Sequence, residues 1–137
     1  VSSGMYDHGK FHRTVTLQNQ PDKRVKIEVI QGGPSMNIAG HKPIKLERTN
    51  KTGIKHLNGT ISMARDKPDS ATGDFFICIG DQPELDFGGK RNPDGQGFGA
   101  FGHVVTGMDV VKKIQQSKAK GQALTPPVFI TKATQLK

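Results

Sequence analysis

The stretch that most constrains the fold of this chain is residues 59–79, where two short apolar segments flank a polar loop. In the first segment, residues 60–64, polar and apolar side chains alternate, which is typical of a half-buried strand. The second, residues 75–79, is continuously apolar and predicts a buried strand. Successive side chains of a strand point to opposite faces, so one of Phe75 and Phe76 can enter the core while the other lines a binding surface.

Outside this stretch the pattern predicts a mainly β protein with one clear helix. The helix is expected at residues 109–116, where Val110, Val111 and Ile114 would share an apolar face and two lysines would point to solvent. Residues 119–127 are interpreted as a linker, and residues 41–58 and 80–102 as mostly irregular. Further strands are predicted at residues 11–16, 26–30, 44–46, 103–105 and 128–130.

One glycine-rich segment imitates a cofactor site. Residues 97–102, GFGAFG, satisfy the dinucleotide pattern GxGxxG. That fingerprint must follow a strand and open a helix, with an acidic residue some distance further on. Here the next residues are predicted to form a strand and no acidic residue follows at the required distance, so we do not assign a nucleotide site.

Composition bounds the class of protein. The 137 residues, 33% of them hydrophobic, predict one domain over residues 1–137 with one core. No apolar run is long enough for a membrane span, so no membrane partner is expected. The formal charge of +8 is dispersed along the chain, which favours a solvated basic surface over a nucleic-acid site. A single cysteine, Cys78, is expected in the core and leaves the compartment open between cytoplasmic and, after removal of a signal peptide, periplasmic or secreted.

The sequence contains no motif typical of hydrolysis, phosphoryl transfer or metal binding. His8 and His12 lie four residues apart, but Gly9 and the strand that follows argue against a helix that would bring them together. No nucleophile elbow, catalytic carboxylate pair or phosphate loop is visible. We therefore expect neither a metal nor a cofactor.

Several short sequence blocks follow one another in a definite order along nearly the whole chain. They are Phe-His-Arg at 11–13, Gln-Gly-Gly at 31–33, Ser-Met-Ala at 62–64, Phe-Phe-Ile at 75–77, Leu-Asp at 85–86, Phe-Gly-His-Val-Val at 101–105 and Gly-Met-Asp-Val-Val at 107–111. In these blocks the chain resembles the cyclophilins, the cyclosporin-binding family of peptidyl-prolyl isomerases.

The resemblance implies a closed antiparallel β-barrel of eight strands with a capping helix. Family members have a first strand and a first helix that this sequence lacks, so we expect that segment to exist in the functional protein. It also implies a monomeric enzyme that accelerates X-Pro rotation in proline-containing peptides and in unfolded or folding proteins. The alternative is a cyclophilin-like peptide-binding or chaperone module with little catalysis.

The resemblance further assigns roles to residues. Isomerisation breaks no covalent bond, and Arg13 is the expected cation that stabilises the proline nitrogen as the amide twists. Gln31 is expected to orient Arg13 and to bind the substrate. The proline pocket is assigned to Met63, Phe76, Leu85 and Phe98. Ala64 and Arg65 are expected to bind the substrate chain through their backbone.

Two departures from the family pattern affect the pocket. Glu28 and Val29 stand where the family has a Phe-Met pair that contributes to the pocket wall. Glu84 stands before Leu85, at a position that is Trp in the strongest cyclosporin binders, and the chain contains no Trp. We therefore expect weak cyclosporin binding.

Overall fold

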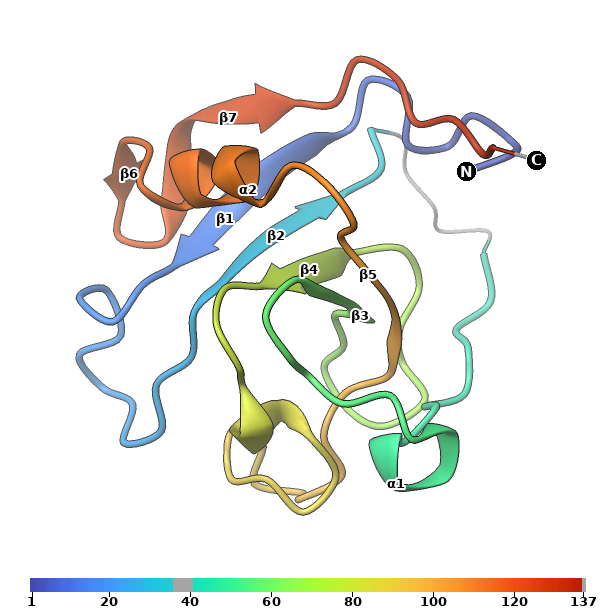
Figure 1. Cartoon of the computed structure of the whole chain (residues 1–137), viewed down its shortest axis with the longest axis vertical. Helices are drawn as coiled ribbons and strands as arrows, with labels where there is room; N and C mark the ends of the chain where they lie inside the picture. The colour runs from blue at the N-terminus through green and yellow to red at the C-terminus, as the bar shows by residue number, and fades with distance from the viewer. Residues whose placement is uncertain (36–40, 137) are drawn as a thin grey trace.

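The chain folds around an antiparallel sheet. The computed structural model describes residues 1–35 and 41–136, and within them seven strands follow the spatial order β5-β3-β4-β2-β1-β7-β6 (Figure 1). In chain order the elements are β1 (Lys10–Val15), β2 (Val29–Gly33), α1 (Thr49–Thr52), β3 (Thr60–Met63), β4 (Phe75–Cys78), the short 3-10 helix η1 (Pro83–Leu85), β5 (Ala100–His103), α2 (Met108–Gln115), β6 (Ala119–Lys120) and β7 (Ala123–Phe129).

Strand β4 lies between β3 and β2 and packs on both faces of the sheet. Phe76 and Cys78 join one apolar cluster, whereas Ile77 belongs to the other and Phe75 packs against it. This is the predicted alternation. Cys78 is fully buried, and burial raises the pKa of its thiol to about 12, so it is a core residue as expected. The two clusters are Val15, Ile27, Val29, Phe76, Cys78 and Leu85, and Ile30, Ile77, Ile79, Val111, Ile114 and Leu124.

Helix α2 packs against β1 and β2 and covers the second cluster. Val111 and Ile114 are buried, as predicted, but Val110 is 53% exposed and does not share their face. The helix begins one residue earlier than expected, so Asp109 lies in its first turn, where the positive end of the helix dipole favours a carboxylate.

The interpretation of residues 119–127 as a linker was wrong. They form the hairpin of β6 and β7, and β7 pairs with β1 along the sheet. Pro126 and Pro127 concealed the strand, because proline cannot donate to a ladder. They are tolerated here because the β1–β7 register shifts between Phe11 and Arg13, and the prolines lie between the paired residues Ala123 and Val128.

Two other segments differ from the sequence prediction. Residues 49–52 form the one-turn helix α1, which ends at Gly53 with φ of 75°, while Ile44 makes only an isolated bridge to Ala71 instead of a strand. Strand β5 spans Ala100–His103 rather than 103–105. The last residues of the GxGxxG pattern are therefore strand and no helix follows them directly, which agrees with rejecting a nucleotide site.

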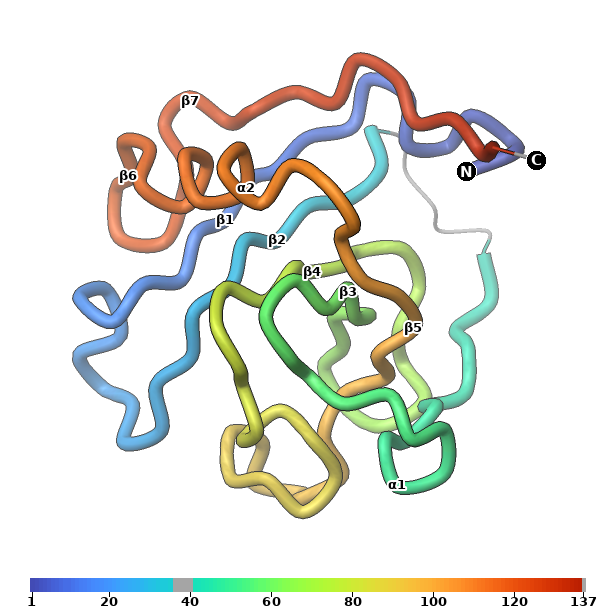
Figure 2. Tube along the Cα trace, in the orientation of Figure 1, coloured from blue at the N-terminus to red at the C-terminus, as the bar shows by residue number. Residues whose placement is uncertain are grey.

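The two ends of the described chain lie side by side (Figure 2). The backbone N–H of Ala133 donates to Asp7 Oδ1 at 2.8 Å, and that of Ile130 donates to the carbonyl of Gly9. Among the described residues, no helix combines the length and apolar character that crossing a bilayer requires.

Candidate active site

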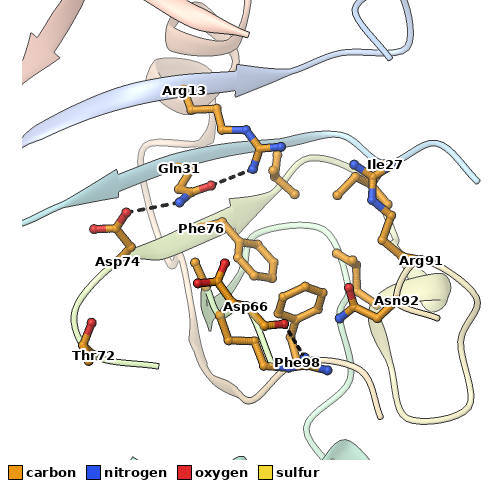
Figure 3. A pocket seen from close by; sticks show the side chains of 14 residues that line it. Arg13, Ile27, Gln31, Asp66, Thr72, Asp74, Phe76, Arg91, Asn92 and Phe98 are labelled. Carbon is orange, nitrogen blue, oxygen red and sulfur yellow. Dashed lines mark hydrogen bonds between the residues drawn. The ribbon is translucent and has the colours of Figure 1, made fainter. Parts of the chain in front are cut away.

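A pocket of about 380 Å³ opens beside β1, β2 and β4. Apolar side chains form its floor, and arginines, aspartates and amides surround them (Figure 3). Its lining residues are Arg13, Ile27, Val29, Gln31, Ala64, Arg65, Asp66, Thr72, Asp74, Phe76, Leu85, Arg91, Asn92 and Phe98.

Strand register builds the centre of this site. Arg13 on β1 pairs with Gln31 on β2, and Gln31 pairs with Phe76 on β4. Directly paired residues of neighbouring strands project from the same face of a sheet. A guanidinium, an amide and an aromatic ring from three distant parts of the sequence therefore stand in one row.

Hydrogen bonds fix the guanidinium of Arg13. Its Nη1 donates to Gln31 Oε1 at 2.7 Å and its Nε donates to Gln122 Oε1 at 2.9 Å. Gln31 Nε2 in turn donates to Asp74 Oδ2 at 3.2 Å. Burial lowers the pKa of Arg13 below its usual range, but an arginine keeps its charge in proteins. The result is a preorganised cation whose neighbours are two neutral amides.

The floor of the pocket is aromatic and aliphatic. Phe76 is 5% exposed and Leu85 is fully buried. The rings of Phe76 and Phe98 meet edge to face, with centroids 5.2 Å apart. Val29, the first residue of β2, and Ile27, two residues before it, complete the wall. Together these side chains form a continuous apolar surface at the base of the pocket.

Arg65 holds Phe98 in place. Its side chain is only 1% exposed, and its guanidinium carbon lies 5.1 Å above the Phe98 ring. It pairs with both carboxylate oxygens of Asp94 at 3.0 and 3.1 Å and donates to the carbonyl of Gly97. Arg65 therefore ties the loop between η1 and β5 to the pocket wall, which its sequence position did not reveal.

A buried polar network supports Phe76 from behind. His56 stacks on its ring at a centroid distance of 5.9 Å. Its Nδ1 forms a hydrogen bond with Asp86 Oδ1 at 2.7 Å, and its Nε2 forms one with Ser62 Oγ at 2.8 Å. The connectivity matches a hydrolase triad. However, Ser62 and His56 are both fully buried, so a substrate in the pocket cannot reach the hydroxyl. We interpret the network as structural.

Most of the residues predicted for the site come together in this pocket. Met63 does not: it borders a separate shallow hollow with Ile44 and Ala71. Because side chains alternate along β3, Ala64 faces the main pocket and its neighbour Met63 faces away. The predicted residues that line the pocket are Arg13, Val29, Gln31, Ala64, Arg65, Phe76, Leu85 and Phe98.

Sequence reasoning missed six of the residues that line the pocket: Ile27, Asp66, Thr72, Asp74, Arg91 and Asn92. It also missed Gln122, which bonds to Arg13. Ile27, two residues before Val29, lies in the pocket wall, where the resemblance had placed Glu28. Glu28 itself points away from the pocket and accepts a hydrogen bond from Gln115 at 3.0 Å. Alternation along the approach to β2 could have identified Ile27. Gln122 and Arg91 reach the site from distant loops, and no local pattern indicates them. In the described ranges, no group of three or more potential metal ligands is present.

The comparisons with known proteins agree with this geometry. The family model described as cyclophilin type peptidyl-prolyl cis-trans isomerase/CLD matches residues 1–135. The chain therefore belongs to the cyclophilin-type peptidyl-prolyl isomerase family, and the resemblance inferred from the sequence blocks is confirmed.

Similar curated proteins carry the same description. The chain is 40% identical over 120 residues to peptidyl-prolyl cis-trans isomerase A of Dickeya dadantii, a match that covers 85% of this chain and 55% of that protein. It is 40% identical over 117 residues to isomerase B of Escherichia coli, covering 82% and 63%. With cyp18 of Streptomyces antibioticus it shares 36% identity over 143 residues, covering 97% and 78%. The chain thus spans little more than half the length of the first two relatives.

A solved structure shares the fold. A cyclophilin-type isomerase of Cryptosporidium parvum, crystallised in the presence of the dipeptide Ala-Pro, superposes with a TM-score of 0.70 at 20% identity. The match covers 96% of this chain and 76% of that one. The mainly β cyclophilin fold is therefore confirmed.

Proposed function

We propose that this chain is a peptidyl-prolyl cis-trans isomerase that acts on proline-containing peptides and on unfolded or folding proteins. The observation that carries the proposal is the row of Arg13, Gln31 and Phe76 across three strands. It places a fixed cation beside an apolar floor, which is the arrangement that X-Pro rotation requires.

The chemistry follows from the amide bond itself. Resonance creates a rotation barrier of roughly 18–20 kcal/mol, and rotation removes that resonance and localises a lone pair on the proline nitrogen. With the proline ring held on Phe76, Phe98 and Leu85, a guanidinium N–H of Arg13 donates to that lone pair in the twisted state. Because the planar states lack a localised lone pair, the interaction favours the transition state over the ground state.

The neighbours of Arg13 make this stabilisation effective. Gln31 and Gln122 hold the guanidinium before substrate arrives, so little reorganisation is needed during rotation. The backbone of Ala64 and Arg65 is proposed to hold the peptide as an extended segment along the pocket edge. A fixed donor of this kind contributes about 10²–10³ in rate.

The test is cis/trans exchange in an Ala-Pro-Phe peptide, followed by NMR exchange spectroscopy. We expect acceleration by the parent chain and a rate about a hundredfold lower for Arg13→Ala. Arg24→Ala is the matched control, because Arg24 is exposed and does not line the pocket. A folded parent without activity would favour the peptide-binding module instead, and an unchanged rate in Arg13→Ala would refute the mechanism.

We also propose that the sheet closes into the barrel that the resemblance implies, so that β5 is not an open edge. Phe101 on β5 and Phe129 on β7 are 52% and 67% exposed, and closure would cover apolar surface there. Hydrogen exchange along β5 tests this. All its amides are protected in a closed barrel, whereas alternate amides exchange freely at an open edge.

A further inference from the structure

The loop between η1 and β5 brings a second guanidinium to the pocket. Arg91 lines the cavity together with Arg13, although 78 positions separate them in the sequence (Figure 3). Its Nη1 donates to Gln20 Oε1 and to the carbonyl of Val25, both at 2.7 Å. Gln20 is itself 2% exposed and bonded to the backbone of Thr16 and Ile27. Arg91 is therefore held at the pocket by a rigid anchor.

Among the described residues, neither guanidinium has a carboxylate within ion-pair distance. The contacts found there between a basic side chain and a carboxylate are those of His12, His56 and Arg65. Burial, and after it the charge of Arg13, lowers the pKa of Arg91. The two cations thus line one pocket, and neither is paired with a carboxylate among the described residues.

Asn92 adds a further donor beside Arg91. Its Nδ2 is buried and has no hydrogen-bond partner in the part of the chain that the structure describes. Buried donors are nearly always paired in folded proteins, so an unpaired one calls for an acceptor. Arg91 and Asn92 thus stand together in the pocket lining, and the Asn92 amide nitrogen lacks a protein acceptor there.

The pocket is electrically polarised. Asp74 and Thr72 lie on one side and Arg91 and Asn92 on the other, with Arg13 between them (Figure 3). Arg65, which also lines the pocket, is already neutralised by Asp94. A bound peptide therefore meets uncompensated positive charge on one side of its proline.

We infer that Arg91, with Asn92, forms a subsite beside the proline pocket that binds an acidic side chain next to the substrate proline. A glutamate carboxylate there accepts charge-assisted hydrogen bonds from the free donors of Arg91. The inference rests on the proposed isomerase function, because it specifies which X-Pro segments that pocket prefers.

The experiment compares matched peptides in the same NMR exchange assay. One pair of peptides carries Glu or Gln directly before the proline, and a second pair carries them directly after it. Glu and Gln have nearly the same size and side-chain length, so only the charge changes within a pair. We expect kcat/KM for the Glu peptide of at least one pair to be roughly fivefold higher than that for the Gln peptide. This ratio corresponds to a difference of about 1 kcal/mol in activation free energy. The preference should shrink between about 0.01 M and 1 M ionic strength, as the screening length falls from roughly 30 to 3 Å.

Variants assign the preference to Arg91. Arg91→Gln should bring the Glu/Gln ratio close to one, and Arg91→Lys should retain part of it because the charge remains. Lys90→Gln is the control: it removes one positive charge from the same loop, but Lys90 is exposed and lies outside the pocket lining. A ratio near one in the parent, or a ratio that Arg91→Gln leaves intact, would overturn the inference.

Binding separates this inference from the isomerase proposal. Chemical-shift titration of the chain with the same peptides measures the Glu preference without any turnover. An active parent that does not distinguish Glu from Gln in either assay refutes the subsite alone. An inactive parent refutes the isomerase proposal, and the titration then still decides whether Arg91 binds the carboxylate.

Discussion

Replacement of His56 by alanine probes how strongly the buried network supports the pocket floor. The imidazole is completely buried and bridges Asp86, Ser62 and the ring of Phe76. Its removal leaves a cavity and takes one partner from each neighbour. The site is thus expected to lose stability and order together.

The size of the effect follows from the contacts. Truncating a large buried side chain to alanine costs about 2–5 kcal/mol, and leaving the buried Ser62 hydroxyl unpaired costs about 1–3 kcal/mol more. Asp86 loses less, because its side chain is 17% exposed and still accepts from the His56 backbone N–H at 2.9 Å. We expect the free energy of unfolding to fall by about 4 kcal/mol, much of the 5–15 kcal/mol typical of a domain.

The assay is denaturant unfolding followed by circular dichroism, with His103→Ala as the control. His103 is exposed at the end of β5, and its replacement is expected to change the free energy of unfolding by less than about 0.5 kcal/mol. A loss below about 1 kcal/mol in His56→Ala would refute the view that the network is buried and paired.

The pH dependence gives this prediction a second readout. Burial lowers the pKa of His56 below its usual 6.5, and this outweighs the opposing hydrogen bond and charge of Asp86. Between the folded and unfolded pKa values the unfolded chain binds more protons, so the stability that neutral His56 contributes is present above pH 6.5 and is lost as the pH falls. The difference between parent and His56→Ala should therefore narrow in acid. An equal difference at pH 7.5 and about pH 5 would contradict this sign.

Three further predictions concern the pocket. Cyclosporin should bind with a dissociation constant above about 1 μM, because Glu84 stands where a Trp wall is expected; calorimetry giving a nanomolar value would exclude this. Arg65→Gln should raise the KM for proline peptides several-fold and lower the free energy of unfolding by about 2–3 kcal/mol, as Phe98 loses its support and several hydrogen bonds disappear. Unaltered KM in steady-state kinetics would show that Arg65 does not position the ring. Gln122→Ala should lower kcat/KM about tenfold through looser positioning of Arg13, with little change in KM; full activity would show that Gln31 alone is sufficient.

Local pattern predicted the central strands and helix well. Residues 60–64 and 75–79 correspond to β3 and β4, and residues 109–116 correspond to α2 within one residue. These elements have strong apolar periodicity, because each buries a defined face. Where periodicity was weak the prediction failed: Pro126 and Pro127 concealed β7, and α1 has a single turn without an apolar stripe.

The family, the central strands and most of the residues that line the pocket could be predicted from sequence, because they depend on short blocks such as Phe-His-Arg at 11–13. How these residues meet depends on the folded chain. Strand register placed Arg13, Gln31 and Phe76 in one row, and alternation along β3 turned Met63 away. The hydrogen-bond network of His56 and the position of Arg91 in the pocket depend on how the loops pack against the sheet. Contacts between residues tens of positions apart leave no periodic trace in the sequence, so they become visible only when the chain is folded.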